Sequence, residues 1–264
     1  MNAPVDSSVL VEVRDGAVWI CLNRPAALNS ITPAIVAGIE AALDRAEQDD
    51  IRAVVLSGNG RAFCAGADLK FVRATSGQDE RNVREFLDSV LRMMTRLETC
   101  PRPVIAAVNG LALAGGLELL LCCDLVIAAR SARIGDAHAN FGLLPGGGSS
   151  VRLPRKIGPT RAKYLLFTGE SVPAADLVSA GLVNEVVEDS DLMAAAGRLV
   201  AKLAVKSPLV LRRMKALVDD GLEQPSAQAL RLELLASELH AHSADMKEGL
   251  AAFEEKRQPR FTGR

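Results

Sequence analysis

Glu118 stands in a segment whose residue types suit acid–base chemistry beside an anion. Gly115 and Gly116 come directly before a predicted helix, and the first N–H groups of a helix have no partner within it and carry partial positive charge. Such a helix end can hold an anion or a developing oxyanion. Glu118 falls within the first turn or so, where burial would raise the pKa of its carboxyl group and suit it to general acid–base catalysis. The alternative is a glutamate that only complements the helix dipole.

His138 lies in a second polar and glycine-rich segment, Ala137–Ser150. The ordinary pKa of histidine is close to neutrality, so His138 could shuttle protons, although a structural hydrogen-bonding role is the alternative. Gly146–Gly148 precede Ser149, but the lysine and the spacing of a Walker motif are missing. The G-x-S-x-G pattern of a nucleophile elbow is missing as well. Neither a nucleotide-binding phosphate loop nor a serine hydrolase is supported.

A segment of small residues, Phe63–Leu69, is a third place where a ligand could be held. It follows a predicted buried strand and a glycine turn. Small side chains allow a ligand to approach the backbone closely, so that peptide N–H groups can serve as hydrogen-bond donors. The alternative is a tight loop that binds nothing.

The bulk composition excludes nucleic acid as a partner. The chain has 264 residues, of which 49% are apolar and 24% charged, an ordinary globular balance. Its net charge of −1 leaves no electropositive surplus for a phosphate backbone. This length allows one large core, or a core with a smaller appendage.

The cysteines and histidines do not predict a metal site. The five cysteines show no metal-ligand spacing, and the three histidines are scattered. Free thiols are typical of a reducing compartment, and Met1–Val9 lacks the apolar region of a signal peptide, so we expect a cytoplasmic protein. The apolar run Val104–Ala129 contains Glu118 and Asp124, which are costly in a bilayer, so we expect no membrane association.

The candidate segments are positioned by predicted strands and helices. We predict a hairpin of Val9–Arg14 and Ala17–Leu22 around an Asp15-Gly16 turn. Thr32-Pro33 predicts the N-terminus of a helix that runs to about Gln48. Further strands are predicted at Ala53–Ser57, Val104–Val108, Asp124–Ala128 and Val183–Val187, and further helices at Asp79–Glu98, Leu117–Cys122, Ala195–Val205, Leu209–Asp219, Ala227–His240 and Ala244–Glu255.

This order of elements predicts an α/β fold followed by helices. Strand, turn and helix alternate three times, which favours stacked ββα units. From Pro173 onward the chain is mostly helical, so we expect a core at residues 1–195 and a helical region at residues 196–264. The alanine- and leucine-rich faces of that region exceed what a small appendage could bury, which predicts a homo-oligomer.

Two of the candidate segments together resemble a known family. Ala62–Leu69 and Val104–Asp124 closely resemble the twin signature of the enoyl-CoA hydratase/isomerase (crotonase) superfamily. Further similarities to family landmarks occur at Asn23-Arg24-Pro25 with Leu28-Asn29, at Gly142–Pro145 and at Phe253–Arg257. The resemblance runs over nearly the whole chain. It implies a crotonase-like spiral of ββα units, a C-terminal α-helical trimerisation region, a homotrimer or hexamer, and an acyl-CoA thioester as substrate, with no cofactor besides the coenzyme A of that substrate.

The resemblance also implies roles for individual residues. It places the oxyanion-hole donors at the backbone N–H groups of Ala67 and Gly115, and it matches Glu118 to the first of two catalytic glutamates. The residues that it implies along the path of coenzyme A are Ala27, Leu28, Ala65, Asp68 and Leu69, with Lys70 as either a phosphate contact or a solvated surface lysine.

The sequence departs from the hydratase pattern at His138, which stands where the second glutamate is expected. Relatives without that glutamate include isomerases, dehalogenases and C–C bond hydrolases. Gly146 stands where certain isomerases carry an aspartate. We therefore expect an enoyl-CoA hydratase-like lyase with Glu118 as the main acid–base group and His138 as its partner. The alternatives are a hydrolase that cleaves a C–C bond in a β-diketone or β-ketoacyl substrate, an enoyl-CoA isomerase, and a non-catalytic acyl-CoA-binding paralogue.

Overall fold

Two mostly parallel sheets form the body of the protein, and the computed structural model describes residues 7–76 and 80–264. The larger sheet holds, in order, β1 (Val9–Arg14), β2 (Ala17–Leu22), β3 (Ala53–Gly58), β5 (Val104–Val108), β7 (Leu125–Ala129) and β10 (Glu185–Val187). The smaller sheet holds β4 (Ala62–Cys64), β6 (Leu111–Leu113), β8 (Arg133–Gly135) and β9 (Ser171–Pro173). Among the described strands, only the pairs β1–β2 and β8–β9 are antiparallel.

Each turn of the chain places one strand in each sheet and then forms a helix. β3 and β4 precede α2 (Leu69–Ser76) and α3 (Glu80–Glu98), and β5 and β6 precede α4 (Gly115–Leu121). β7 and β8 precede the short 3₁₀ helix η2 (His138–Phe141). The predicted α/β spiral of ββα units is confirmed.

Parallel pairing in the smaller sheet decides where the candidate segments lie. β4, β6 and β8 are parallel neighbours, so their C-terminal ends meet at one edge of the sheet. The segments that follow these strands begin at Ala65, Ala114 and Asp136. Segments far apart in the sequence are therefore side by side in space.

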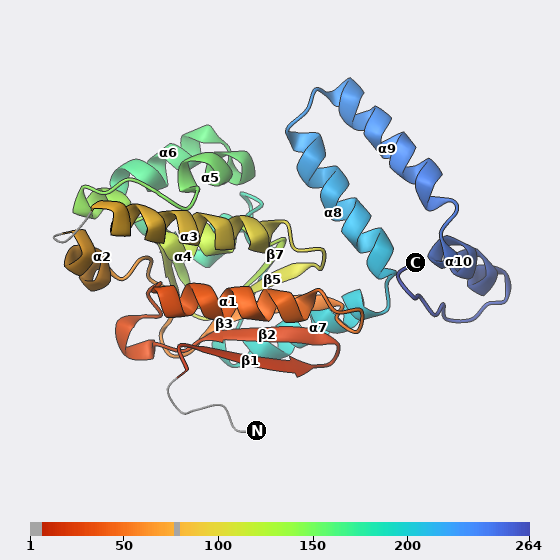
Figure 1. Cartoon of the computed structure of the whole chain (residues 1–264), viewed down its shortest axis with the longest axis horizontal. Coiled ribbons are helices and arrows are strands. Elements are labelled where there is room, and N and C mark those ends of the chain that lie inside the picture. The colour runs from red at the N-terminus through yellow and green to blue at the C-terminus, as the bar shows by residue number, and fades with distance from the viewer. Residues whose placement is uncertain (1–6, 77–79) are drawn as a thin grey trace.

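The N-terminal elements form as their local sequence dictates. Arg14 pairs with Ala17 across the predicted hairpin turn, where Asp15 and Gly16 both have positive φ angles of 52° and 71°. Thr32 caps α1 (Pro33–Ala46) by accepting a hydrogen bond from the Ile35 N–H at 3.4 Å. The short 3₁₀ helix η1 (Pro25–Ala27) connects the two regions. Figure 1 shows α1 lying along the hairpin, and α1 also packs against α3.

Three α-helices have no counterpart among the predicted elements, and the first of them is α2. α5 (Ser149–Ile157) and α6 (Pro159–Thr168) follow the glycine-rich segment directly. Pro154 lies inside α5, and Gly158 separates α5 from α6, which begins at Pro159. These residues interrupt the apolar spacing that identifies a helix. The prediction of α3 began at Asp79, which lies outside the described residues, as do residues 1–6.

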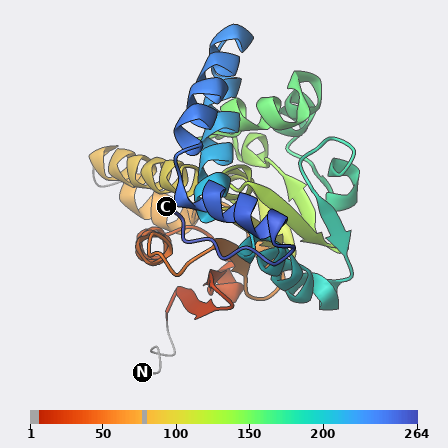
Figure 2. The same ribbon diagram turned by 90° about the vertical axis from the view of Figure 1, so that its right-hand side faces the viewer.

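The expected division at residues 195 and 196 falls inside α7 (Leu192–Ala204). This helix packs against β3, β5 and β7, and it buries Ala195, Ala196 and Val200 in the core. The helices that project from the body begin only with α8 (Pro208–Leu222) and continue with α9 (Ser226–His240) and α10 (Ala244–Glu254). Figures 1 and 2 both show α8 and α9 extending away from the sheets. The 3₁₀ helices η3 (Ala174–Leu177) and η4 (Asp189–Asp191) flank β10. None of the helices in the described residues has the length and apolar character needed to cross a bilayer.

Candidate active site

A cavity of about 200 Å³ lies at the edge of the smaller sheet, where the three candidate segments meet. Four of the residues predicted for the chemistry line it: Ala67, Gly115, Glu118 and His138. Most of its remaining lining is apolar and comprises Ile31, Leu69, Val72, Val83, Phe86, Leu87, Val90, Leu143 and Leu144, with Gly146 and Gly147. An apolar cavity with a few converging polar groups is the usual form of a small-molecule site.

The backbone N–H groups of Ala67 and Gly115 lie close together and are free to bind a ligand. A Cβ atom built on Gly115 would lie 3.4 Å from the Ala67 nitrogen, and one built on Gly66 would lie 3.1 Å from the Gly115 nitrogen. Within the described residues, neither N–H group donates a hydrogen bond to the protein. Gly115 is also the first residue of α4, so its N–H points out of the helix end. The pair can donate to one oxygen atom.

A strained turn at Ala114 and two glycines, Gly66 and Gly116, bring the N–H groups of Ala67 and Gly115 close together. Ala114 has φ 49° and ψ −118°, a backbone conformation that costs a non-glycine residue about 1–3 kcal/mol. Its N–H donates to the Gly135 carbonyl at 3.2 Å, which ties the turn to β8. A Cβ atom on Gly116 would lie 1.9 Å from the Cys64 carbonyl oxygen, so that position requires glycine.

The two carboxylate oxygens of Glu118 have different surroundings, because only Oε1 accepts hydrogen bonds from the described residues. Its side chain is buried, with the residue 3% exposed. Oε1 accepts hydrogen bonds from the N–H groups of Gly147 at 2.8 Å and Ser149 at 3.1 Å, whereas Oε2 has no hydrogen-bond partner among the described residues. Burial raises the pKa of the carboxyl group, against the lowering effects of the Ser149 N–H, the His138 charge and the Gly147 N–H. Oε2 is therefore the atom placed to exchange a proton.

His138 is the second group able to move a proton in this cavity. Its Nδ1 lies 2.9 Å from Asp136 Oδ1, and its backbone N–H donates to the same oxygen at 3.2 Å. Burial lowers the pKa of the imidazole, but the hydrogen bond and charge of Asp136 and the charge of Glu118 together raise it above its ordinary value. Asp136 was not among the predicted site residues. The signal for it was an aspartate two residues before the histidine, directly after a strand.

An ion pair anchors the segment that holds Glu118. Arg152 donates from Nη1 to the Gly147 carbonyl at 2.6 Å, and it makes two further hydrogen bonds to Glu98 on α3, at 2.9 Å and 2.6 Å. Bidentate pairs of this kind fix geometry as well as charge. The Gly147 N–H is thereby kept in position beside Glu118.

The residues expected along the coenzyme A path lie around the cavity in different ways. Leu69 lines it, whereas Lys70 is exposed to solvent. The Asp68 carboxylate pairs with Arg24 at 3.0 Å and accepts hydrogen bonds from the first N–H groups of α2, so it organises the protein itself.

The remaining coenzyme A path residues do not line the cavity: Ala27 ends η1, Leu28 follows it, and Ala65 lies in the loop after β4. The Ala65 N–H donates to the Leu28 carbonyl at 3.0 Å, which joins the two loops. Leu28 has a positive φ of 52°, so the chain turns sharply at this contact.

Comparison with known proteins gives matches over almost the whole chain. A family model described as enoyl-CoA hydratase/isomerase matches residues 12–264. A crotonyl-CoA hydratase of Syntrophomonas wolfei is 34% identical over 256 residues, which covers 96% of this chain and 97% of that protein. An enoyl-CoA isomerase/hydratase of Mycosarcoma maydis is 37% identical, covering 94% and 93%. The crystal structure of an enoyl-CoA hydratase from Bacillus anthracis superposes with a TM-score of 0.92 at 38% identity and covers 97% of this chain and 100% of that one.

Proposed function

Because this chain belongs to the enoyl-CoA hydratase/isomerase family, we propose that it is a hydratase, which adds water across the 2,3 double bond of an enoyl-CoA thioester. One observation carries this proposal. The Ala67 and Gly115 donors, Glu118 and His138 all line a single cavity. Hydration needs an anion site for the thioester oxygen and two groups that move protons, and this cavity offers both.

The proposed reaction uses the two halves of the cavity together. The thioester oxygen accepts hydrogen bonds from the N–H groups of Ala67 and Gly115, which draws electron density away from C3. Water attacks C3, and one of the pair Glu118 and His138 accepts its proton while negative charge collects on the thioester oxygen as an enolate. The other member of the pair delivers a proton to C2. Each N–H donor of this kind is worth about 3–4 kcal/mol to such a transition state, and no cofactor is needed.

The apolar wall gives the acyl group a place beside these reacting atoms. We propose that the acyl chain lies against α3, whose residues Phe86, Leu87 and Val90 line the cavity. Coenzyme A would then leave the cavity past Leu69 and follow the joined loops of Leu28 and Ala65. Lys70, exposed at this side, would meet a phosphate group.

A hydrolase that cleaves a C–C bond is the second candidate, because a histidine backed by an aspartate is suited to activating water. Incubation with enoyl-CoA and β-ketoacyl-CoA substrates in ¹⁸O-labelled water tests the two. A hydratase gives a 3-hydroxyacyl-CoA with the thioester intact and one labelled oxygen at C3. A C–C hydrolase gives two shorter products, an isomerase gives a product of unchanged mass, and a non-catalytic paralogue binds the ester without turnover.

Gly147→Ala should lower the turnover of enoyl-CoA by about 10-fold or more, because small displacements of a catalytic group are costly. The new Cβ atom would lie 2.6 Å from Glu118 Oε2 and 2.5 Å from the Met94 sulfur, so the carboxylate must shift. Gly197→Ala is the control, since Gly197 lies on α7 outside the cavity and no atom lies within 4 Å of the Cβ atom that the substitution would add. Steady-state kinetics of both variants check this. Equal activities would show that the position of Oε2 does not matter.

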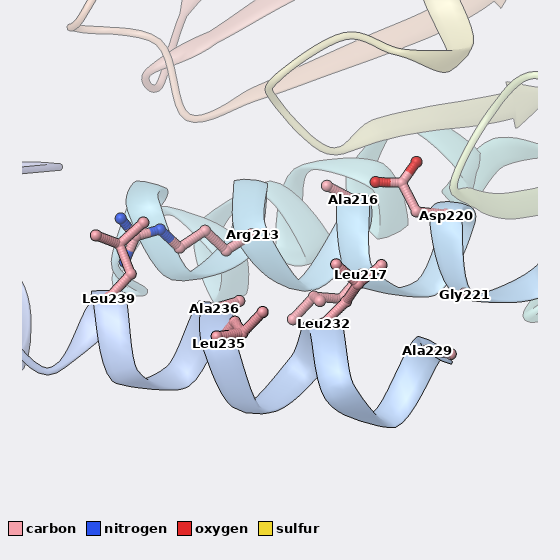
Figure 3. Close-up of a pocket in the computed structure, with 10 residues that line it drawn as sticks. All are labelled: Arg213, Ala216, Leu217, Asp220, Gly221, Ala229, Leu232, Leu235, Ala236 and Leu239. Carbon is pink, nitrogen blue, oxygen red and sulfur yellow. The ribbon is translucent and has the colours of Figure 1, made fainter. Parts of the chain in front are cut away.

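The C-terminal helices leave an apolar face that we propose is covered by further copies of the chain. Figure 3 shows the groove between α8 and α9, where Leu217 and Leu232 lie between the two helices. Leu230 and Leu234 do not line this groove, and they are 66% and 61% exposed. They lie one helical turn apart on α9, a helix in which no residue is buried. Such a surface is typical of a subunit interface.

We therefore expect a trimer or hexamer at micromolar concentrations in sedimentation equilibrium. Replacing both Leu230 and Leu234 by aspartate should shift the protein to monomers, because charges at the centre of an apolar interface are costly to bury. A wild-type chain that sediments as a stable monomer would contradict this assembly.

The cysteines are consistent with a reducing environment. All five are free thiols, and four of them are buried. Burial raises the pKa of Cys64 and Cys122 to about 12, so these thiols are unreactive at neutral pH. A cytoplasmic location stays a prediction.

A further inference from the structure

We infer that Asp136 is a positioning residue that fixes the tautomer of His138. The buried carboxylate of Asp136 accepts a hydrogen bond from the Nδ1–H of the imidazole. Nε2 then carries no proton and can act as the general base in the cavity. This assignment of roles rests on the proposed hydration reaction. In that reaction His138 accepts the proton from water, and Glu118 delivers a proton to C2. A water proton passes to Nε2, the hydroxyl oxygen bonds to C3, and the Glu118 proton passes to C2.

The chain directs this carboxylate specifically at the histidine. β8 ends at Gly135, and Ala137 adopts a left-handed conformation with φ 60°, which folds the backbone so that Asp136 Oδ1 meets both the N–H and Nδ1 of His138. Asp136 is 1% exposed, and its Oδ2 has no hydrogen-bond partner among the described residues. No arginine or lysine of the described chain pairs with it. A buried carboxylate with a single histidine partner is costly unless the pair has a function.

The charges around His138 come from two elements. Asp136 faces it from the end of β8, and Glu118 faces it from α4. Asp136 stabilises the protonated imidazole, and Glu118 adds to this when it is ionised, so the base becomes inactive as the pH falls through the raised pKa of His138. Removing the charge of Asp136 should lower that pKa, and the acid limb of the pH–rate profile should therefore move to lower pH.

A purely structural role for Asp136 is the alternative, because aspartate often accepts the N–H two residues ahead in a turn. Asp136→Asn separates the two roles. Asparagine keeps an oxygen acceptor for both His138 groups, removes the charge and places an NH2 group where Oδ2 has no hydrogen-bond partner. We expect kcat to fall by at least about 10²-fold with little change in KM, because the histidine base loses the charged group that orients it and stabilises its protonated form. In a His138→Ala background the same substitution should change kcat less than about 2-fold, as expected when one residue acts only through the other.

Nitrogen-15 NMR of the side chains tests the tautomer without any reaction. The chain has only three histidines, so the His138 signals are those missing from His138→Ala. The neutral wild-type ring should carry its proton on Nδ1, Asp136→Asn should lower the His138 pKa, and Asp136→Ala should move the proton to Nε2. The wild-type spectrum alone shows which nitrogen carries the proton, so the inference can be tested even if a variant does not fold.

Asp124→Asn is the matched control. Asp124 is a carboxylate outside the cavity, where it pairs with Lys215 at 2.8 Å. Its substitution should leave both the acid limb and the His138 resonances in place. A wild-type His138 protonated on Nε2, or an Asp136→Asn variant with an unchanged His138 pKa, would overturn the inference. A wild-type protein that does not hydrate enoyl-CoA but shows the Nδ1–H tautomer would overturn the proposed reaction and leave the positioning role standing.

Discussion

Replacing Glu118 by glutamine should lower the turnover of enoyl-CoA by at least about 10²-fold, the usual scale for a general acid–base group. Glutamine keeps an oxygen that can accept the N–H groups of Gly147 and Ser149, so the fold around the residue should persist. It cannot release a proton from the position of Oε2. Affinity for a CoA ester should therefore stay close to that of the wild type. Steady-state kinetics and calorimetric titration with an unreactive acyl-CoA measure the two quantities separately.

The control for this variant is Glu188→Gln, which removes a charge from an exposed ion pair with Arg130. Exposed pairs contribute little, so its kinetics should be those of the wild type. Wild-type turnover in Glu118→Gln would remove Glu118 from the mechanism.

His138→Ala should lower turnover by a comparable factor, about 10²-fold, and should flatten the acid limb of the pH–rate profile. A histidine can act as a base only when its imidazole is neutral, and the pKa of His138 is raised in this cavity. Wild-type activity should thus fall as the pH drops through that raised value. Measuring kcat/KM against pH for both proteins gives the comparison. An acid limb that is the same in both would contradict a catalytic role for His138.

His138→Glu distinguishes the two candidate reactions. Under the hydratase mechanism a glutamate restores the second carboxyl group that the family resemblance implies, so hydration of a short enoyl-CoA should be retained or increased. Under the C–C hydrolase mechanism the same change should abolish cleavage, because the neutral imidazole that accepts and returns the proton is lost.

The local sequence was sufficient to predict the elements that carry strong signals. The Asp15-Gly16 hairpin and the Thr32 cap are confirmed because each depends on neighbouring residues only. The buried strand Val104–Val108 is confirmed for a similar reason, since its uninterrupted apolar run identifies it. The helices after Gly148 were missed because Pro154 interrupts their pattern.

Other parts of the site depend on contacts that cannot be predicted from the spacing of residue types along the sequence. Asp136 meets His138 only because Ala137 takes a left-handed conformation, which alanine rarely adopts. The hydrogen bonds to Glu118 come from backbone N–H groups about 30 residues further along the chain, at Gly147 and Ser149, and any residue type except proline could supply them. The boundary after Ala195 was drawn where the alanine-rich helix begins, but small residues such as Ala195 and Ala196 are also what allow α7 to pack closely against a sheet.

We propose that one cavity combines the Ala67 and Gly115 donors with the pair Glu118 and His138 to hydrate an enoyl thioester. The most direct measurement is the rate at which crotonyl-CoA loses its conjugated ultraviolet absorbance, compared between the wild type and a Glu118→Gln/His138→Ala double variant at saturating substrate. The double variant should be slower than the wild type by at least about 10²-fold, yet little slower than the slower single variant, because residues that act as a unit are not additive. A wild-type rate no higher than that of the double variant, with crotonyl-CoA bound by both, would contradict the account.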